Sequence, residues 1–600
     1  MSRLLAFSLL ALAFSGLASE GAASESWVPL GPPGGDVRSL AADPRYPRVL
    51  YLGTADGVVY RSDDAGGRWQ RLVPGFERRG MSLDDLVVGP QGTLYVGYWE
   101  VNGPSGGVAR SEDGGRHFTV LTEGQGVRAL ALAASDPRVV YVGTWHLPWK
   151  TTDAGASWHP VRAGMIDDSD VMTLNLDRRD PDVVFATACS GIYRSPNAGG
   201  SWSRIRGIPT SSRRTRAFAQ DPARAERLYA GTTEGLWASD DGSLTWQLLT
   251  RKDLVVNAVL PLPGGMVLVG SDGAGVLKST DHGRTFTASN EGFSTRFVSQ
   301  VVVDPDSGRL FAGIRHDRRH GGVVTAPRPD GPWVALGTGL EGREVLSLAE
   351  AGRGEDEVVL AGTDDGLFLY AAHCGVWRRL PTVVGGLEVH PRVAHLAAAS
   401  PLLLAAATPT GLLMSRDGGL SWELQTLGLA ADATAVAFSD REPFILVAAT
   451  ALGVFRSDDL GQRFVQVSNG VAGALVAGLS FLPGDPRVLF ATTPIGLLRS
   501  PDTGQTWARH GGGLPFSDIT GLAFASDGRT VFASDFQQGG LYSSGDGGLT
   551  WSPLPTEGLL GDRVWALAQG PRGRLLAATA GAGLRELRPE PPANDVAASR

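Results

Sequence analysis

Aromatic and charged side chains gather in short segments of the first half of the chain, each directly after an apolar run. Tyr98-Trp99-Glu100 and Trp145-His146 are two such segments. Aromatic faces with nearby carboxylates and arginines are suited to gripping a sugar or a peptide, although solvated loops can have a similar composition. The residues that we predict to bind a ligand are Trp99, Glu100, Trp145, His146, Glu234 and Arg315.

The chemistry that carboxylates could do in such loops is hydrolysis of a glycosidic bond. A glycosidase places two carboxyl groups across the scissile bond, one of them acting as an acid. Asp56, Glu100 and Asp170 are candidates, but nothing in their spacing selects a pair. His316 and His320 are four residues apart in an expected loop rather than on a helix, which disfavours a zinc site. We predict no metal and no cofactor.

These segments lie between copies of an eight-residue repeat with the pattern Ser/Thr-x-Asp-x-Gly-x-x-Trp/Phe. The first copy runs from Ser62 to Trp69, and further copies follow at intervals of 40 to 49 residues, with worn copies near Ala326 and Tyr370. A period of this size is typical of a β-propeller with one blade per repeat. The third position is occupied by Asp64, Asp113, Asp153, Asn197, Asp241, Asp281, Asp417, Asp459, Asp502 and Asp546.

The repeated aspartate is better suited to holding a turn than to catalysis. Short polar side chains accept hydrogen bonds from nearby backbone N–H groups in turns. The glycine supplies the positive φ of a tight turn, and the Trp or Phe can bury its ring between neighbouring sheets. We therefore predict a structural role for all ten positions.

Each repeat contains four short apolar runs separated by turn residues, which predicts a four-stranded antiparallel sheet. Propellers typically have four to eight blades, so thirteen units favour an all-β fold of two rings, with six or seven blades each. We expect the first ring over residues 25–340 and the second over 341–588. The last unit lacks a strand that residues 26–30 can supply, in which case one ring is nested within the other. The expected first strands start near residues 37, 82, 127, 170, 215, 255, 297, 345, 393, 433, 475, 518 and 564.

The octapeptide resembles the Asp-box, or BNR repeat, over nearly the whole chain from about Trp27 to Leu587. This repeat is shared by sialidases, tandem-propeller xyloglucan-acting glucanases, sortilin-type receptors and photosystem II assembly propellers of the stability-factor kind. The resemblance implies the fold and places the Asp-box away from the site. In the glucanases an early loop resembles Arg-Thr-Asp-x-Gly-Gly with a catalytic Asp, whereas Ala55 stands at that place here. A Phe/Tyr-Arg-Ile-Pro motif typical of sialidases is absent near the start.

Composition and charge narrow the classes of partner and compartment. The chain has a net charge of −8 without a basic stripe, which disfavours nucleic acid. Arg3, the apolar run from Leu4 to Leu17 and the small residues that follow predict an export signal over residues 1–24. We expect a secreted or periplasmic monomer without membrane insertion, and a disordered tail over residues 589–600.

These patterns favour an exported double β-propeller that serves as a binding or scaffold module for a protein or glycan ligand at the mouth of its first ring. The alternative is a glycoside hydrolase that acts on a polysaccharide with paired carboxylates in a cleft between the rings. A third hypothesis, an assembly factor for a membrane complex, follows only from the resemblance to Asp-box proteins.

Overall fold

The computed structural model describes residues 25–589 except for 77, 79, 134, 135, 137, 167–169, 213, 305, 352–357, 385, 426–431, 442, 443, 468–474, 510, 511, 516 and 560–562. The expected export signal and residues 590–600 of the expected tail lie outside the described residues. The described part of the chain consists of β-strands, short 3-10 turns and loops. No helix in it is long and apolar enough to span a bilayer.

Thirteen four-stranded sheets form the blades of two β-propellers. Twelve of the sheets are built from four strands consecutive in the sequence. The first strand of each sheet contacts the first strand of the next sheet, so these strands line the axis of each ring. Their bounds are β2 (Ser39–Ala42), β6 (Met81–Val88), β10 (Val127–Leu132), β14 (Val171–Leu176), β18 (Thr215–Gln220), β22 (Val256–Pro261), β26 (Val298–Val303), β30 (Val345–Ala351), β36 (His395–Ala398), β40 (Ala433–Phe438), β44 (Gly478–Leu482), β48 (Ile519–Phe524) and β52 (Val564–Gln569).

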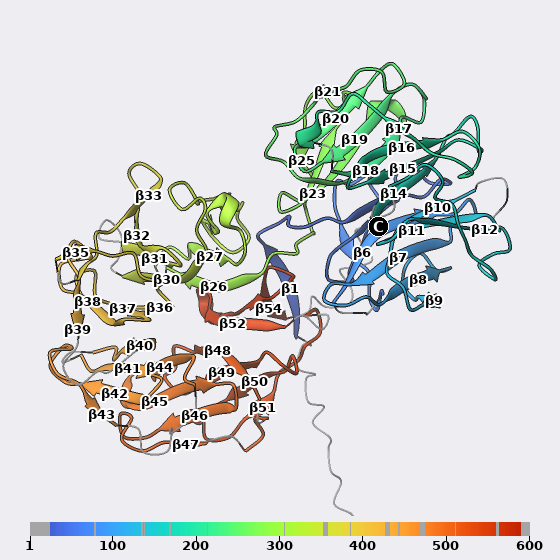
Figure 1. Cartoon of the computed structure of the whole chain (residues 1–600). Coiled ribbons are helices and arrows are strands. Elements are labelled where there is room, and N and C mark those ends of the chain that lie inside the picture. The colour runs from blue at the N-terminus through green and yellow to red at the C-terminus, as the bar shows by residue number, and fades with distance from the viewer. Residues whose placement is uncertain are drawn as a thin grey trace, which may run out of the picture.

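Contacts between the first strands close the blades into a ring of six and a ring of seven. β22 contacts β2 and closes the six-bladed ring, and β52 contacts β26 and closes the seven-bladed ring. Figure 1 shows the two rings as separate lobes, one blue to green and the other green to red. The fold expected from the repeat, two propellers of six to seven blades, is confirmed.

The six-bladed ring is inserted into the seven-bladed ring. β1 (Glu25–Gly31) pairs antiparallel with β54 (Leu584–Pro589), with Trp27 opposite Leu587, and completes the sheet of β52. In Figure 1 the blue β1 lies beside the red β54 for this reason.

The boundary between the rings lies between β25 (Thr287–Ala288) and β26, not at residue 340. Residues 298–335, expected in the first ring, form a blade of the seven-bladed ring, since β26 contacts both β30 and β52. The worn octapeptides near Ala326 and Tyr370 therefore both lie within the seven-bladed ring.

Apolar clusters between neighbouring sheets hold each ring together. Where the six-bladed ring closes, Leu52, Trp69, Leu268 and Phe293 are buried in one cluster, and none of the four is more than 1% exposed. Burial of a large apolar side chain contributes about 1.5–3 kcal/mol. Because every sheet has a neighbour on both faces, a closed ring leaves little sheet surface exposed.

The Asp-box is a hydrogen-bonded turn at the rim of each blade that carries it. In the first blade the Ser62 hydroxyl donates to Asp64 Oδ1 over 2.7 Å, and the Gly66 N–H donates to Ser62 Oγ over 2.9 Å. The Arg68 N–H also donates to Asp64 Oδ1, over 2.9 Å. Gly66 has a φ of +83°, which a side chain would disfavour. In the fourth blade Asn197 makes the equivalent bonds to Ser195 and Ser201.

Removal of the indole side chain of Trp27 should destabilise the seven-bladed propeller ring, although Trp27 is far from most of that ring in the sequence. Its side chain is 2% exposed in a cluster with residues of β48, β52 and β53 (Leu575–Thr579). We expect Trp27→Ala to cost about 3–5 kcal/mol, and Leu402→Ala at an exposed position of the same ring less than about 0.5 kcal/mol. Chemical denaturation with limited proteolysis measures both. Preferential cleavage within residues 39–288 would contradict the nested closure.

An Asn should replace the Asp-box aspartate better than an Ala does. Asp281 Oδ1 accepts from the Arg284 and Thr285 N–H groups and from the Ser279 hydroxyl, as the amide oxygen of Asn197 does in its own turn. We expect Asp281→Ala to lower the Tm by roughly 2–4 °C and Asp281→Asn by less. Equal Tm values for the two variants would show that the acceptor oxygen is unimportant.

Candidate functional site

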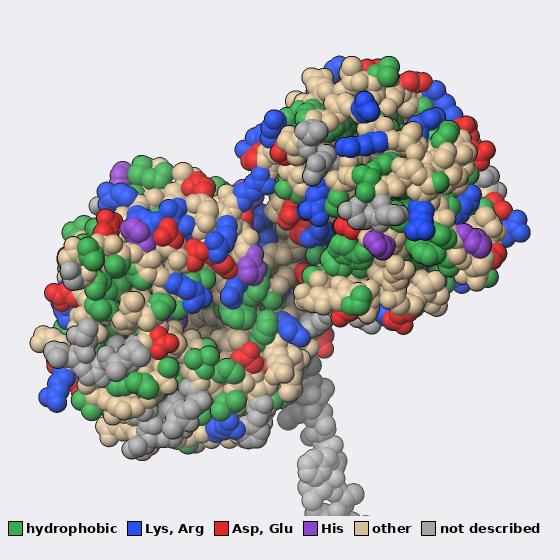
Figure 2. All heavy atoms as spheres, in the orientation of Figure 1, with side chains coloured by type: hydrophobic (Ala, Val, Ile, Leu, Met, Phe, Trp, Pro, Cys, Tyr) green, Lys and Arg blue, Asp and Glu red, His purple; other side chains and the backbone are tan. Residues whose placement is uncertain are grey.

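The loops at the start of the first strand and the end of the second strand form the mouth of each ring, and the two mouths meet at the junction. Arg296, which directly precedes the seven-bladed ring, connects them. Its Nη2 donates to the Gly273 carbonyl of the six-bladed ring over 3.2 Å, and its Nη1 donates to Asp317 Oδ2 of the seven-bladed ring over 3.3 Å. Asp56 of the six-bladed ring also lies at this junction, beside Gly581 of the seven-bladed ring. A Cβ atom added to Gly581 would be 3.4 Å from Asp56 Oδ2. Figure 2 shows charged side chains along the border between the two lobes.

Three partly exposed aromatic rings at the mouth of the seven-bladed ring form what we call the aromatic platform: Phe297, Phe536 and Trp565. The Trp565 ring centroid is 5.5 Å from that of Phe297 and 5.0 Å from that of Phe536. Phe297 directly precedes the first strand β26, and Trp565 is the second residue of the first strand β52. These two strands contact each other where the ring closes. The Arg315 guanidinium lies 5.3 Å from the Trp565 centroid and 5.7 Å from the Phe297 centroid.

Two carboxylates lie beside this platform. Glu344 precedes β30, and Asp364 follows β31 (Val358–Thr363). Arg318 Nη2 is 3.3 Å from Glu344 Oε2 and 2.7 Å from Asp364 Oδ2, so these oxygens are no more than about 6 Å apart. Arg315 Nε and His316 Nδ1 also lie 3.6 and 3.4 Å from Glu344 Oε1.

The mouth of the six-bladed ring carries a mixed cluster of arginines, carboxylates and tryptophans. Arg128 Nε donates to Asp84 Oδ2 over 3.1 Å, and Arg128 Nη1 lies 3.7 Å from Asp170 Oδ2. Trp99 and Trp145 stack edge to face with centroids 4.9 Å apart. The Arg128 guanidinium lies 4.3 Å from the Trp145 centroid, close enough for a cation–π interaction.

Asp36 contributes a carboxyl group to the same mouth. Burial raises the pKa of Asp36 to about 6, against the opposing effect of Arg38, whose Nη2 lies 2.7 Å from it. The Asp36 N–H donates to Thr295 Oγ1 over 2.7 Å, which ties this position to the segment between the rings.

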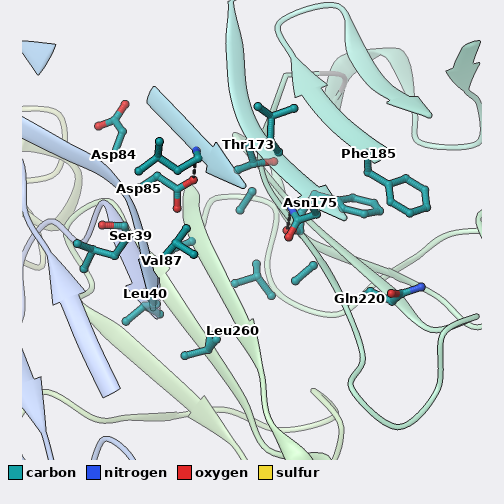
Figure 3. A pocket seen from close by; sticks show the side chains of 18 of the residues that line it. Ser39, Leu40, Asp84, Asp85, Val87, Thr173, Asn175, Phe185, Gln220 and Leu260 are labelled. Carbon is teal, nitrogen blue, oxygen red and sulfur yellow. Dashed lines mark hydrogen bonds between the residues drawn. The ribbon is translucent and has the colours of Figure 1, made fainter. Parts of the chain in front are cut away.

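Behind this mouth, the axis of the six-bladed ring holds a cavity of about 240 Å³ lined by the first strands (Figure 3). Asp85 lies in its wall, and its Oδ2 accepts from the Leu130 N–H over 2.7 Å. Burial raises the pKa of Asp85 to about 8. The carboxyl group is therefore largely protonated at pH 7.

The residues predicted from the sequence fall into separate environments. Trp99, Trp145 and Asp170 lie in the cluster around Arg128, whereas Glu100 folds back so that a Cβ on Gly103 would be 2.2 Å from its Oε2. His146 is exposed next to Trp145. Glu234 accepts from the Ser212 hydroxyl over 2.8 Å, and this bond lowers the Glu234 pKa. Arg315, expected at the mouth of the first ring, follows β27 (Leu310–Ile314) of the seven-bladed ring.

Several residues at the mouths are not among the site residues predicted from the sequence: Phe297, Phe536, Trp565, Glu344, Asp364, Arg38 and Arg128. Most of them stand singly at the starts of first strands, where they look like ordinary strand residues. A usable signal is the position just before or just inside each first strand, since within one ring all such positions lie at the same mouth. Among the described residues, no group of three or more His, Cys, Asp or Glu side chains could hold a metal ion.

No protein-family model matches the chain, and no curated protein matches it. Solved structures with the same fold include the GH74 xyloglucanase from Xanthomonas campestris, with 18% identity, a TM-score of 0.70, and coverage of 94% of this chain and 100% of that one. The Niastella koreensis GH74 enzyme has 17% identity and a TM-score of 0.66 over 93% of this chain and 91% of that one. An ancestral GH74 enzyme has 16% identity and a TM-score of 0.62 over 95% of this chain and 100% of that one. At these identities the likeness shows the shared fold.

The buried carboxyl group of Asp85 should make stability depend on pH. Its pKa is about 8 in the folded state, whereas in the unfolded chain it ionises near pH 4. Between these values the folded state binds more protons, so its stability falls as the pH rises. The loss is at most about 1.4 kcal/mol per pH unit in this window. Urea denaturation between pH 5 and 8 should show wild type losing stability relative to Asp85→Asn. A constant difference between the two proteins would contradict the assignment.

Proposed function

We propose that this protein binds a glycan in the cleft where the mouths of the two rings meet. The observation that carries the proposal is the aromatic platform, with Arg315 over Trp565 and Glu344 within 3.6 Å of Arg315. Pyranose rings have apolar C–H faces and polar hydroxyl edges. An aromatic ring bordered by charged hydrogen-bonding groups is complementary to both.

The position of the platform supports the same conclusion. Phe297 directly follows Arg296, the residue that bridges both rings, so the platform borders the junction rather than the outer rim. A polymer that lies on the platform can extend towards Asp56 and Trp145 on the other ring. The shared fold with GH74 enzymes is compatible with a polysaccharide ligand, and the apolar run from Leu4 to Leu17 supports export to where such ligands occur.

Hydrolysis of the bound glycan is a second candidate function. The observation in its favour is the pair Glu344 and Asp364, whose oxygens are at most about 6 Å apart. This upper limit fits the spacing of about 5–5.5 Å in retaining glycosidases and is below the roughly 6.5 Å of inverting ones. Arg318 opposes it, because its guanidinium pairs with both carboxylates and so stands between them, where a scissile bond would have to lie. Ala55 leaves the early loop without the carboxylate that the glucanase pattern has there.

Replacement of Trp565 tests the binding proposal. We expect Trp565→Ala to weaken the binding of a β-glucan oligosaccharide about tenfold, since a stacked aromatic group contributes on the order of 1 kcal/mol or more. Tyr46→Ala is the matched control, because Tyr46 is 62% exposed and also lies beneath an arginine, Arg45, on a loop away from the mouths. Titration calorimetry measures both variants.

The same preparations distinguish binding from hydrolysis. If wild type releases reducing ends from the glycan and the Glu344→Gln and Asp364→Asn variants do not, the protein is a hydrolase. If substitution of Asp56, Glu100 or Asp170 abolishes this hydrolysis instead, the catalytic groups belong to the six-bladed ring. Equal affinities of Trp565→Ala and wild type would contradict the platform as the binding surface.

A further inference from the structure

We propose that the mouth of the six-bladed ring binds the carboxylate of an acidic sugar unit, so that the glycan recognised in the cleft contains uronic acid. The inference rests on the proposed glycan function and assigns a ligand class to the second mouth. It is carried by unpartnered donors, by the arrangement of the arginines and by the exposed face of Trp145.

Two buried donors in the cluster have no hydrogen-bond partner among the described residues: Trp99 Nε1 and Arg128 Nη1. The nearest carboxylate oxygen to Arg128 Nη1 is Asp170 Oδ2 at 3.7 Å, too far for a hydrogen bond. Indole and guanidinium groups donate and do not accept. A group that satisfies both must therefore be an acceptor.

Arginines from different blades converge at this mouth. Arg216 donates to Asn257 Oδ1 over 2.7 Å and lies 4.0 Å from Asp272 Oδ2. Its pKa is lowered by burial and by the positive charges of Arg38, Arg214 and Arg128. Arg214 is exposed, and no hydrogen bond of its side chain occurs among the described residues.

The carboxylates that the structure describes at this mouth are largely engaged by the inner arginines. Asp36 pairs with Arg38, and Asp84 and Asp170 lie against Arg128. Asp272 faces Arg216 at 4.0 Å and is half exposed. This arrangement leaves Arg214 to receive an anionic group from solvent. A guanidinium fork matches the geometry of a carboxylate.

The tryptophans select a sugar over a free anion. Trp145 is 38% exposed and rests edge to face on Trp99, so its orientation is held while part of its surface faces solvent. A pyranose ring can stack on this face with its carboxylate towards the arginines. The cavity of about 240 Å³ opens behind Arg38 and Asp84, which line it and also belong to the mouth.

The test is calorimetric titration of the full chain with galacturonic acid oligosaccharides and with neutral galactose oligosaccharides of equal length. We expect the acidic ligand to bind at least about tenfold more tightly at low salt and the difference to shrink as salt increases. Arg214→Gln and Trp145→Ala should each weaken the acidic ligand about fivefold or more. Arg284→Gln is the matched control, an exposed arginine at the outer rim of the same ring.

The outcomes separate this inference from the proposed function. Equal affinities for both ligands, lowered only by Trp565→Ala, would overturn the inference and leave the glycan function intact. No binding of either ligand would overturn both. If inorganic sulfate competes with the acidic ligand as strongly in Trp145→Ala as in wild type, the site is a general anion site, which would contradict the sugar assignment.

Discussion

The pairing of β1 with β54 closes the seven-bladed ring and determines where the six-bladed ring is joined to it. It completes the last blade of the seven-bladed ring with a strand from the other end of the chain. The six-bladed ring is thereby held at both ends, because its entry segment follows β1 and its exit segment leads into β26. The two segments also meet each other in a parallel bridge between Gly34 and Ser294. This double connection positions the mouths of both rings at one junction.

Structural and functional roles are divided between rim and mouth. The Asp-box residues satisfy backbone groups at the rim of their blades, where the carboxylate is engaged by its own turn. The mouths carry residues that differ from blade to blade, including Trp145 and Arg128 in one ring and Trp565 and Arg315 in the other. A regular scaffold of this kind lets individual loop residues vary without loss of the ring.

The sequence predicted the blades well because each blade is encoded locally. The predicted first strands near residues 127, 215, 345 and 433 begin within one residue of β10, β18, β30 and β40. The ring boundary was misplaced by about fifty residues, because it depends on packing between β22 and β2 and between β52 and β26, which are far apart in the sequence. Among the candidate site residues, Trp99 and Trp145 can be predicted together, since each stands at the end of a conspicuous apolar run. Phe297 and Trp565 were missed because ring closure alone brings them together.

We infer that one ligand lies across the mouths of both rings. Oxidative footprinting of the full chain, with and without a saturating acidic oligosaccharide, tests this claim directly by following oxidation of individual aromatic residues. We expect the ligand to protect Trp145 and Trp565 together and to leave Tyr46 unchanged. Protection of only one mouth, or protection at Tyr46 without either tryptophan, would contradict it.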